Sequence, residues 1–357
     1  MQEENVSRVV NNATDTRSEY AILAPPLFSV IIVVGCIGNT LLLYTVIRWR
    51  EMRTPCNYLI ANNAIADLGI VTIAAPLRIV DVYQGWVLGK PVCQLLAPTQ
   101  DALAVVSIIT YTLIAFERYR AVLSPFKRKL SSRSILIIIL VTWVLAYLSA
   151  GLPIAMHLTV VNKAGKSYCM ASFASDVSRQ IYEIYLVVVF LLIPLTLQTL
   201  AYSRLVHRLT REDPLKRSFS DPRSSHKRQL KKKRLVRVTI TLVVFFHICY
   251  IPRMVVMLIY EFARPSFTNN IYFKYADLVI LVLFYVKHVI NPLILFSIST
   301  AFRRRFPCNM SNMYNCRSSF LARALSSRRL TLTSKLIETM EKGNGENGEV
   351  IHRESML

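Results

Sequence analysis

Residues 134–157 read SILIIILVTWVLAYLSAGLPIAMH and contain no Asp, Glu, Lys or Arg. At a rise of about 1.5 Å per residue, a helix of this length crosses the roughly 30 Å hydrocarbon layer of a membrane. Comparable apolar stretches occur before and after it, although several contain isolated ionisable residues or prolines. The predicted spans are Pro26–Ile47, Asn57–Val82, Val92–Val122, Ser134–His157, Tyr182–Val206, Val236–Phe262 and Tyr275–Ser297. The expected fold is an all-α membrane protein, a seven-transmembrane helix bundle.

The composition agrees with membrane insertion. The 357 residues are 53% hydrophobic and 18% charged, and the formal net charge is +22. The charged residues lie between the apolar stretches, whereas a basic nucleic-acid-binding domain carries its charge on one face of a compact motif. We therefore expect no nucleic-acid partner. The first 24 residues lack the basic start and apolar core of a cleavable signal peptide, so the first span is expected to act as its own insertion signal.

Lysine and arginine predict which side of the membrane each loop occupies. The loops after the first, third and fifth spans are rich in these residues, and the last of them contains Lys231-Lys232-Lys233-Arg234. Because basic loops stay in the cytosol, the amino terminus is expected outside the cell and the tail from Ser299 inside. This predicts an extracellular tail at 1–24, a membrane domain at 25–298 and a cytosolic segment at 299–357.

Two features agree with this orientation. Asn5-Val6-Ser7 and Asn12-Ala13-Thr14 are N-glycosylation sequons, which are used only outside the cell. Cys93 and Cys169 are the only cysteines expected on that oxidising side. A disulfide between them is the natural pairing, and two free thiols are the alternative.

Each predicted span carries one motif. Asp67 lies in the middle of the second, Glu117-Arg118-Tyr119 closes the third, and Asn291-Pro292 lies deep in the seventh. The remaining spans carry Gly38-Asn39, Trp143, Pro194 and Pro252. In this order the motifs resemble the rhodopsin-like (class A) G-protein-coupled receptors, from about Gly35 to Phe306. The resemblance implies a multi-pass receptor in the plasma membrane.

The resemblance also implies roles for single residues. Arg118 would pair with Glu117 at rest and be released toward a heterotrimeric G protein on activation. Span six offers Lys232 and Lys233 near its cytosolic start and no acid there, so an interhelical lock on Arg118 is not expected. A short amphipathic helix at Phe302–Phe306 would place its arginines against lipid headgroups and both phenylalanines in the interface. Other positions that match the family's activation switches are Asp67, Ser107, Tyr119, Tyr202, Phe246, Pro252, Asn291 and Pro292.

Three positions depart from the family pattern. Tyr250 replaces the tryptophan usual before the span-six proline, and Leu295 replaces the tyrosine usual at the end of the Asn-Pro motif. Lys287 stands where the family contributes to a sodium site beside Asp67. An ammonium cannot coordinate sodium, so Lys287 is expected to neutralise Asp67, with the adjacent His288 as another partner to consider. Agonist binding should then be nearly insensitive to sodium, and Lys287→Asn should create sensitivity.

The ligand-facing positions favour a peptide. Gln100 occupies the place of the aspartate that amine receptors carry 18 residues before the arginine of Glu-Arg-Tyr. A glutamine there resembles the receptors for neuropeptide Y, orexin and RFamide peptides. The segments Thr159–Val161 and Tyr168–Met170 flank a turn and predict a hairpin lid. We expect a neuropeptide with a basic, amidated carboxyl end. Candidate contacts are Asp101, Glu183, Glu261 and Asp277, with Arg78 and Arg253 as opposing positive charges.

Two other interpretations of the spans stay open. An opsin-like photoreceptor needs a span-seven lysine for retinal, but Lys287 lies one turn from that position, where the chain has Leu283 or Phe284. A non-signalling seven-span membrane protein is the second alternative. The sequence contains no metal-ligand cluster, nucleophile motif or phosphate-binding loop, so no enzymatic activity, metal or cofactor is expected.

The cytosolic segments carry candidate partner sites. The basic region Arg208–Arg237 is expected to contact the G protein and anionic lipid. Cys308 and Cys316 are candidates for palmitoylation, with two reduced thiols as the alternative. The terminal Ser355-Met356-Leu357 has the form that PDZ domains bind. Candidate phosphorylation sites for receptor kinases and arrestin are Ser326, Ser327, Thr331, Thr333 and Ser334.

Overall fold

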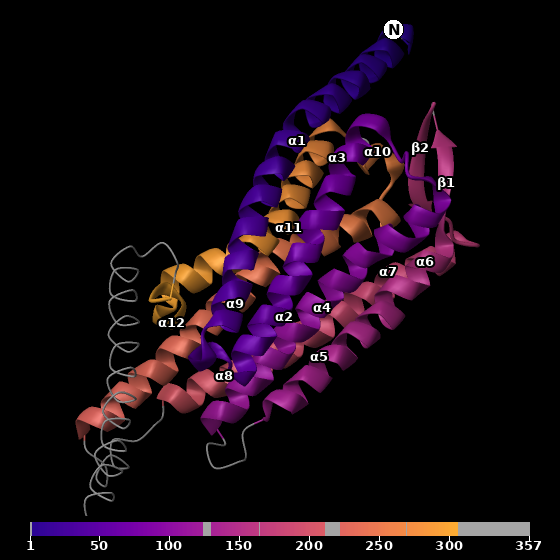
Figure 1. The fold of residues 1–357 in the computed structure, drawn as a ribbon. Helices are drawn as coiled ribbons and strands as arrows, with labels where there is room; N and C mark the ends of the chain where they lie inside the picture. Colours follow the sequence, from indigo (N-terminus) through magenta and orange to yellow (C-terminus); the bar gives the residue numbers. More distant parts are fainter. Residues whose placement is uncertain (1, 124–129, 164, 211–221, 269, 306–357) are drawn as a thin grey trace, which may run out of the picture. The chain divides into compact units, whose positions relative to one another are not determined.

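A computed structural model gives the fold (Figure 1). It describes residues 2–123, 130–163, 165–210, 222–268 and 270–305. The chain divides into two units, Met1–Arg303 and Arg304–Leu357, and the second lies almost wholly outside the described residues. Every helix and strand named below belongs to the first unit.

Within the described residues, seven helical segments are long and apolar enough to cross a membrane, which confirms the predicted bundle. In chain order their helices are α1 (Gln2–Arg48), α2 and α3 (Pro55–Gly69 and Ala75–Gln84), α4 (Gly89–Leu123), α5 and α6 (Ser132–Ala146 and Leu152–His157), α7 and α8 (Asp176–Val187 and Ile193–Thr210), α9 (Pro222–Phe262) and α11 (Ile271–Ile298). Shorter elements are the 3-10 turn η1 (Arg50–Met52), α10 (Pro265–Thr268) and α12 (Thr300–Arg303).

Spans two, four and five each contain a π-helical turn. The turns η2 (Ile70–Ala74), η3 (Tyr147–Gly151) and η4 (Val188–Leu192) all end two residues before a proline. Proline has no backbone N–H, and its ring collides with the carbonyl four residues earlier. That carbonyl belongs to the π turn in all three spans. The wider turn moves the carbonyl aside, so the helix continues past the proline.

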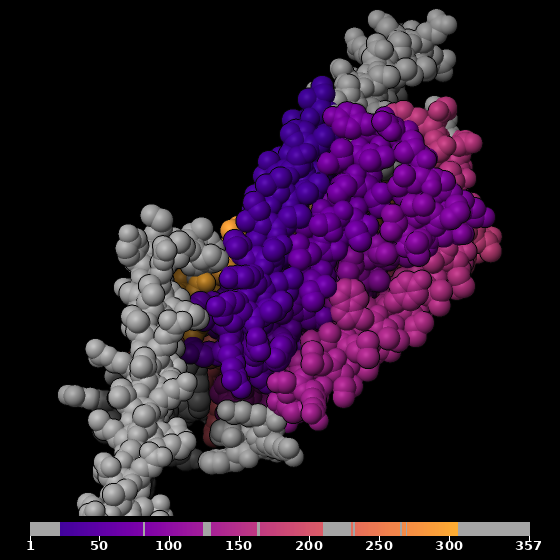
Figure 2. Space-filling model, viewed as in Figure 1, coloured from indigo at the N-terminus to yellow at the C-terminus, as the bar shows by residue number. Residues whose placement is uncertain are grey.

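Apolar side chains cover the outside of the bundle. On α5, Ile137 and Leu140 are 63% and 65% exposed, whereas Thr142 on the same helix is 3% exposed. A water-soluble protein buries such apolar side chains, so this pattern fits a hydrocarbon solvent. In the view of Figure 2 the side chains coloured from indigo to magenta form a continuous surface.

Inside the bundle, side chains of one helix donate hydrogen bonds to neighbouring helices. The helices α1 and α11 lie side by side (Figure 1), and Asn39 Nδ2 donates to the His288 carbonyl over 2.9 Å. Span four is joined to span two because Trp143 Nε1 donates to Asn62 Oδ1 over 2.8 Å. Contacts of this kind, together with close packing, hold membrane helices together in lipid, where the hydrophobic effect between helices is absent.

The prediction that both phenylalanines of 302–306 enter the lipid interface is wrong for Phe302. Its side chain is 2% exposed, and its ring lies edge-on to Phe296 of α11, with the centroids 5.9 Å apart. The helix α11 ends at Ile298, and Ser299 is extended (φ −83°, ψ 112°). The chain therefore turns at Ser299, and α12 brings Phe302 into the protein core. Phe306 lies outside the described residues.

Candidate ligand cavity and activation network

An antiparallel hairpin of β1 (Leu158–Lys163) and β2 (Lys166–Ala171) follows α6. Its strands contain both segments that the sequence predicted. Gly165, at the turn, takes up the left-handed backbone conformation (φ +74°) that glycine tolerates best. We call this end of the bundle the hairpin end, and the sequence predicts that it is extracellular.

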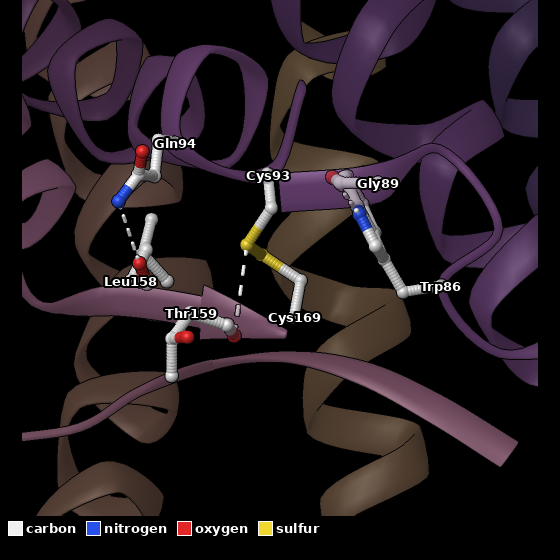
Figure 3. Close-up of a disulfide and its surroundings, with 7 residues drawn as sticks. All are labelled: Trp86, Gly89, Cys93, Gln94, Leu158, Thr159 and Cys169. Atoms are coloured by element: carbon white, nitrogen blue, oxygen red, sulfur yellow. Dashed lines mark hydrogen bonds between the residues drawn. A yellow bond between two sulfur atoms is a disulfide. The ribbon is translucent and has the colours of Figure 1, made fainter. Parts of the chain in front are cut away.

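A disulfide fixes β2 to α4. Cys93 and Cys169 are bonded, with their Cα atoms 5.7 Å apart, which confirms the predicted pairing (Figure 3). Beside the disulfide, Gln94 Nε2 donates to the Leu158 carbonyl of β1 over 3.0 Å. The two strands are therefore both attached to the first turns of α4.

Trp86, between α3 and α4, holds the hairpin from another side. Its backbone N–H donates to the Ser167 carbonyl of β2 over 2.7 Å. Its indole Nε1 donates to the Gly89 carbonyl over 2.8 Å (Figure 3). Gly85 permits this approach, because its φ is +73° and a Cβ there would lie 2.5 Å from the Ser167 oxygen.

Replacing both Cys93 and Cys169 by alanine should lower the free energy of unfolding by about 2–5 kcal/mol. The substitution opens a loop whose ends are 76 residues apart in sequence and removes the covalent attachment of the hairpin. Thermal unfolding of the purified protein in detergent measures the loss. The half-buried free Cys36 supplies the control, because Cys36→Ala breaks no disulfide. Equal melting temperatures for the double variant and Cys36→Ala would contradict the prediction.

A cavity of about 290 Å³ lies next to the disulfide, with Cys169 in its wall. Each of spans two to seven contributes side chains, most of them apolar or aromatic. Such a wall with a few polar groups is typical of ligand sites. The charged and amide side chains on the wall are Arg78, Gln100, Asp101 and Arg253.

Three of these four groups are held by the protein itself, and one of them, Arg78, interacts with the Tyr285 side chain. Gln100 Oε1 accepts a hydrogen bond from the Tyr285 hydroxyl over 2.9 Å. Arg253 Nη1 pairs with Asp277 Oδ1, also at 2.9 Å. Asp101 makes no hydrogen bond and no ion pair with any residue that the structure describes. Asp101 is the carboxylate of the described cavity wall, and the charges of Arg78 and Arg253 act on it without forming an ion pair.

The other acidic residues predicted to bind ligand are not part of the cavity wall. Asp277 is occupied by Arg253, as described above. Glu261 pairs with Arg179 of α7 at 3.1 Å, and its side chain is only 7% exposed. Glu183 makes no hydrogen bond or ion pair within the described ranges. Two of the three predicted acids at this end are thus already paired, by arginines that are distant in sequence.

Asp67 is the centre of a buried hydrogen-bond network. Its Oδ1 lies 2.6 Å from His288 Nδ1. Its Oδ2 accepts from Asn63 Nδ2 over 2.8 Å and from Asn291 Nδ2 over 2.7 Å. The Tyr111 hydroxyl donates to Asn291 Oδ1 over 2.7 Å. The cavity between these groups measures about 10 Å³, room for about one water molecule.

The predicted pairing of Lys287 with Asp67 is wrong as a direct contact, although the charge of Asp67 still acts on Lys287. Lys287 Nζ has no hydrogen-bond partner among the described residues, and His288 meets Asp67 in its place. Successive residues of an α-helix point about 100° apart, so Lys287 is directed toward α9 when His288 faces Asp67. The rings around the ammonium, with the distances from Nζ to their centroids, are Phe246 (4.6 Å), Tyr250 (5.4 Å) and Phe284 (5.1 Å).

At the other end of α4, Arg118 Nε lies 3.2 Å from Glu117 Oε2, as predicted. The same Nε donates to Cys56 Sγ of α2 over 3.1 Å. The sequence did not predict this contact, because a single cysteine at the start of a span forms no motif. Arg118 is therefore restrained by span two as well as by its neighbour. Of the other predicted switch residues, Ser107, Tyr202, Phe246, Tyr250, Asn291 and Pro292 are buried, and Tyr119 and Pro252 are half-buried.

Comparison with known proteins agrees with the motifs. Residues 38–295 match the family described as 7 transmembrane receptor (rhodopsin family). Neuropeptide FF receptor 1 of Homo sapiens is 29% identical over 255 residues, which cover 67% of this chain but 58% of that receptor's length. The substance-K receptor of Canis lupus familiaris is 29% identical over 287 residues, 78% and 73% of the two chains. The pyroglutamylated RF-amide peptide receptor of Rattus norvegicus is 28% identical over 302 residues, 78% and 67%. Since the family match covers well over half of the sequence, the chain belongs to the rhodopsin family of seven-transmembrane receptors.

Proposed function

We propose that the chain is a receptor that binds an extracellular peptide and activates a heterotrimeric G protein. The observation that carries the proposal is the cavity beside the disulfide-bonded hairpin, with the unpaired Asp101 in its wall. The similar proteins are named as receptors for neuropeptide FF, substance K and an RF-amide peptide, which supports a peptide ligand. The restrained Arg118 at the far end of α4 supports a resting state that a G protein can relieve.

A panel of peptides tests the proposal on cells that express the chain. At least one peptide with a basic, amidated carboxyl end should activate a G protein. The response should be lost in Arg118→Ala at matched surface expression. A panel without any response, although the protein is present at the cell surface, would count against the proposal.

The carboxylate of the described cavity wall favours a basic ligand group, whereas Arg78 and Arg253 add positive charge to the same wall. A ligand guanidinium can pair with Asp101 in a water-poor site, where charge-assisted hydrogen bonds are strong. Amidation removes the negative carboxyl charge from the peptide end. The ligand then brings no carboxylate that would compete with Asp277 for Arg253.

Glu261→Gln should weaken the potency of such an agonist by about one to several kcal/mol. The expected reason is that a ligand arginine replaces Arg179, which is 45% exposed and is released at little cost. Arg179→Ala is the matched variant, because it frees Glu261 and should preserve or raise potency. Dose–response curves at equal surface expression measure both effects. An unchanged potency in Glu261→Gln would remove Glu261 from the ligand site.

Agonist binding should be nearly insensitive to sodium. The oxygens of Asp67 already contact His288, Asn63 and Asn291, and the adjoining cavity is about 10 Å³. Because His288 and not Lys287 contacts Asp67, we now expect His288→Asn, in place of Lys287→Asn, to create sodium sensitivity. This substitution frees one carboxylate oxygen of Asp67 and enlarges the space beside it. Agonist competition binding is measured in sodium chloride and, as the control, in the chloride of an organic cation at equal ionic strength. Strong inhibition of the unsubstituted receptor by sodium would contradict this prediction.

The opsin-like alternative is not favoured. Lys287 does not contribute to the cavity wall, whereas Phe284, near the position where an opsin carries its lysine, does. A retinal in the cavity would therefore meet an aromatic ring in place of an amine.

Several predicted modification and partner sites remain proposals. The basic region Arg208–Arg237 is described only in part. The sequons at Asn5 and Asn12 lie where side chains are not described. Wholly outside the described residues are the palmitoylation candidates Cys308 and Cys316, the kinase and arrestin sites Ser326, Ser327, Thr331, Thr333 and Ser334, and the PDZ-type terminus Ser355-Met356-Leu357.

A further inference from the structure

Lys287 is a buried cation that forms no hydrogen bond or ion pair with the residues that the structure describes. Its side chain is 1% exposed. An unpaired ammonium inside a membrane protein is costly, and such groups are usually functional. Asp67 attracts the ammonium only through its charge and makes no direct contact with it, because its oxygens are held by other donors. The direct contacts of the ammonium are with the surrounding aromatic rings.

The rings form a cage that joins two spans. Phe246 and Tyr250 lie one turn apart on α9 and are stacked, with centroids 5.3 Å apart and ring planes at 20°. Phe284 lies on α11, close to one turn before Lys287. All three rings lie within the roughly 6 Å over which a cation is attracted to a ring face, and the attraction is stronger in a desolvated site. The ammonium of α11 therefore holds α9 through two of its rings.

The cage lies between the ligand cavity and the Asp67 network. Tyr250 and Phe284 form part of the cavity wall, so one side of each ring is accessible to a ligand. Lys287 is followed directly by His288, whose Nδ1 contacts Asp67. A displacement of either ring changes the environment of the ammonium, and any rotation of α11 moves His288 with it.

We infer that Lys287 is a latch between spans six and seven. In the unliganded protein its ammonium holds Phe246 and Tyr250 of α9 against α11. When α9 moves away, the ammonium loses the rings and stays buried without a partner, so the closed arrangement is favoured. A ligand that displaces Tyr250 or Phe284 releases the latch. This last step rests on the proposed function, whereas the latch itself concerns the protein without ligand.

Fluorinated phenylalanines at position 246 test the latch. Each added fluorine withdraws electron density from the ring face and weakens its attraction for a cation, while the shape of the ring is nearly kept. A fluorescent label on Leu230→Cys, at an exposed site near the basic end of α9, reports the position of that helix. Cys36, Cys308 and Cys316 are replaced by alanine, and the remaining free cysteines, Cys56 and Cys249, are buried. The measurement needs neither ligand nor G protein, so its failure is distinct from a failure of the proposed function.

In the protein with Lys287, each added fluorine should favour the conformation in which α9 has moved away from α11. Across the whole series the equilibrium constant for this movement should rise roughly tenfold, or about 1.4 kcal/mol. The same series should be flat in Lys287→Met and should persist in Lys287→Arg, which keeps a cation. Phe28 is the control ring, because it is buried against Tyr285 and lies outside the cage. No shift with Lys287 present, or an equal shift in Lys287→Met, would overturn the latch. If Lys287→Met does not fold, equal shifts for the series at positions 246 and 28 would overturn it.

Discussion

Asp67→Leu should lower the free energy of unfolding by about 3 kcal/mol or more. Leucine keeps much of the volume but offers no acceptor, so the hydrogen-bonding groups of His288, Asn63 and Asn291 lose their buried partner. Each buried donor left unsatisfied costs about 1–3 kcal/mol. Thermal unfolding of the purified receptor in detergent measures the loss.

Ser107→Ala is the matched control for this substitution. Ser107 is fully buried, and its Oγ has no hydrogen-bond partner among the described residues. Its removal should change stability by less than about 1 kcal/mol, because no hydrogen bond is lost. If Asp67→Leu unfolds at the same temperature as Ser107→Ala, the network around Asp67 does not stabilise the bundle.

Asp101→Asn should reduce the potency of a basic peptide agonist by roughly 30-fold to several thousandfold. These factors correspond to about 2–5 kcal/mol, the usual cost of removing one partner of a buried charge pair. Asp101 faces the cavity and is unpaired, so its charge is available to a ligand. Concentration–response curves at matched surface expression measure the change.

Glu183→Gln provides the comparison for Asp101→Asn. Glu183 is also an unpaired acid on a spanning helix, but it does not belong to the cavity wall. It should therefore have the smaller effect. A gain of potency in Asp101→Asn would show that an acidic ligand group faces Arg78 and Arg253, and would contradict the proposed basic ligand.

The spans, the hairpin and the disulfide could be predicted because each depends on a strong local or topological signal. Membrane thickness sets the length of an apolar helix, and the basic loops placed Cys93 and Cys169 on the same side. The π turns before the prolines of spans two, four and five were not predicted. A proline signals an interruption in the helix, but it does not say whether the chain responds with a kink or with a wider turn.

The candidate site was predicted less completely, because its contacts depend on the rotation of helices and on distant partners. Lys287 and His288 are neighbours, and about 100° of rotation decides which of them meets Asp67. Glu261 is paired with Arg179, 82 residues away in sequence, and no motif marks such a pair. Phe302 belongs to an amphipathic pattern, but the turn at Ser299 decides whether it enters lipid or protein.

Nucleotide exchange on a purified G protein tests the proposed receptor most directly. The purified chain in lipid nanodiscs is mixed with members of each G-protein class and with a peptide that binds it. The peptide should accelerate exchange on at least one class, and Arg118→Ala should abolish the acceleration without abolishing peptide binding. A peptide that binds the unsubstituted chain but leaves exchange unchanged on every class would contradict a G-protein-activating receptor.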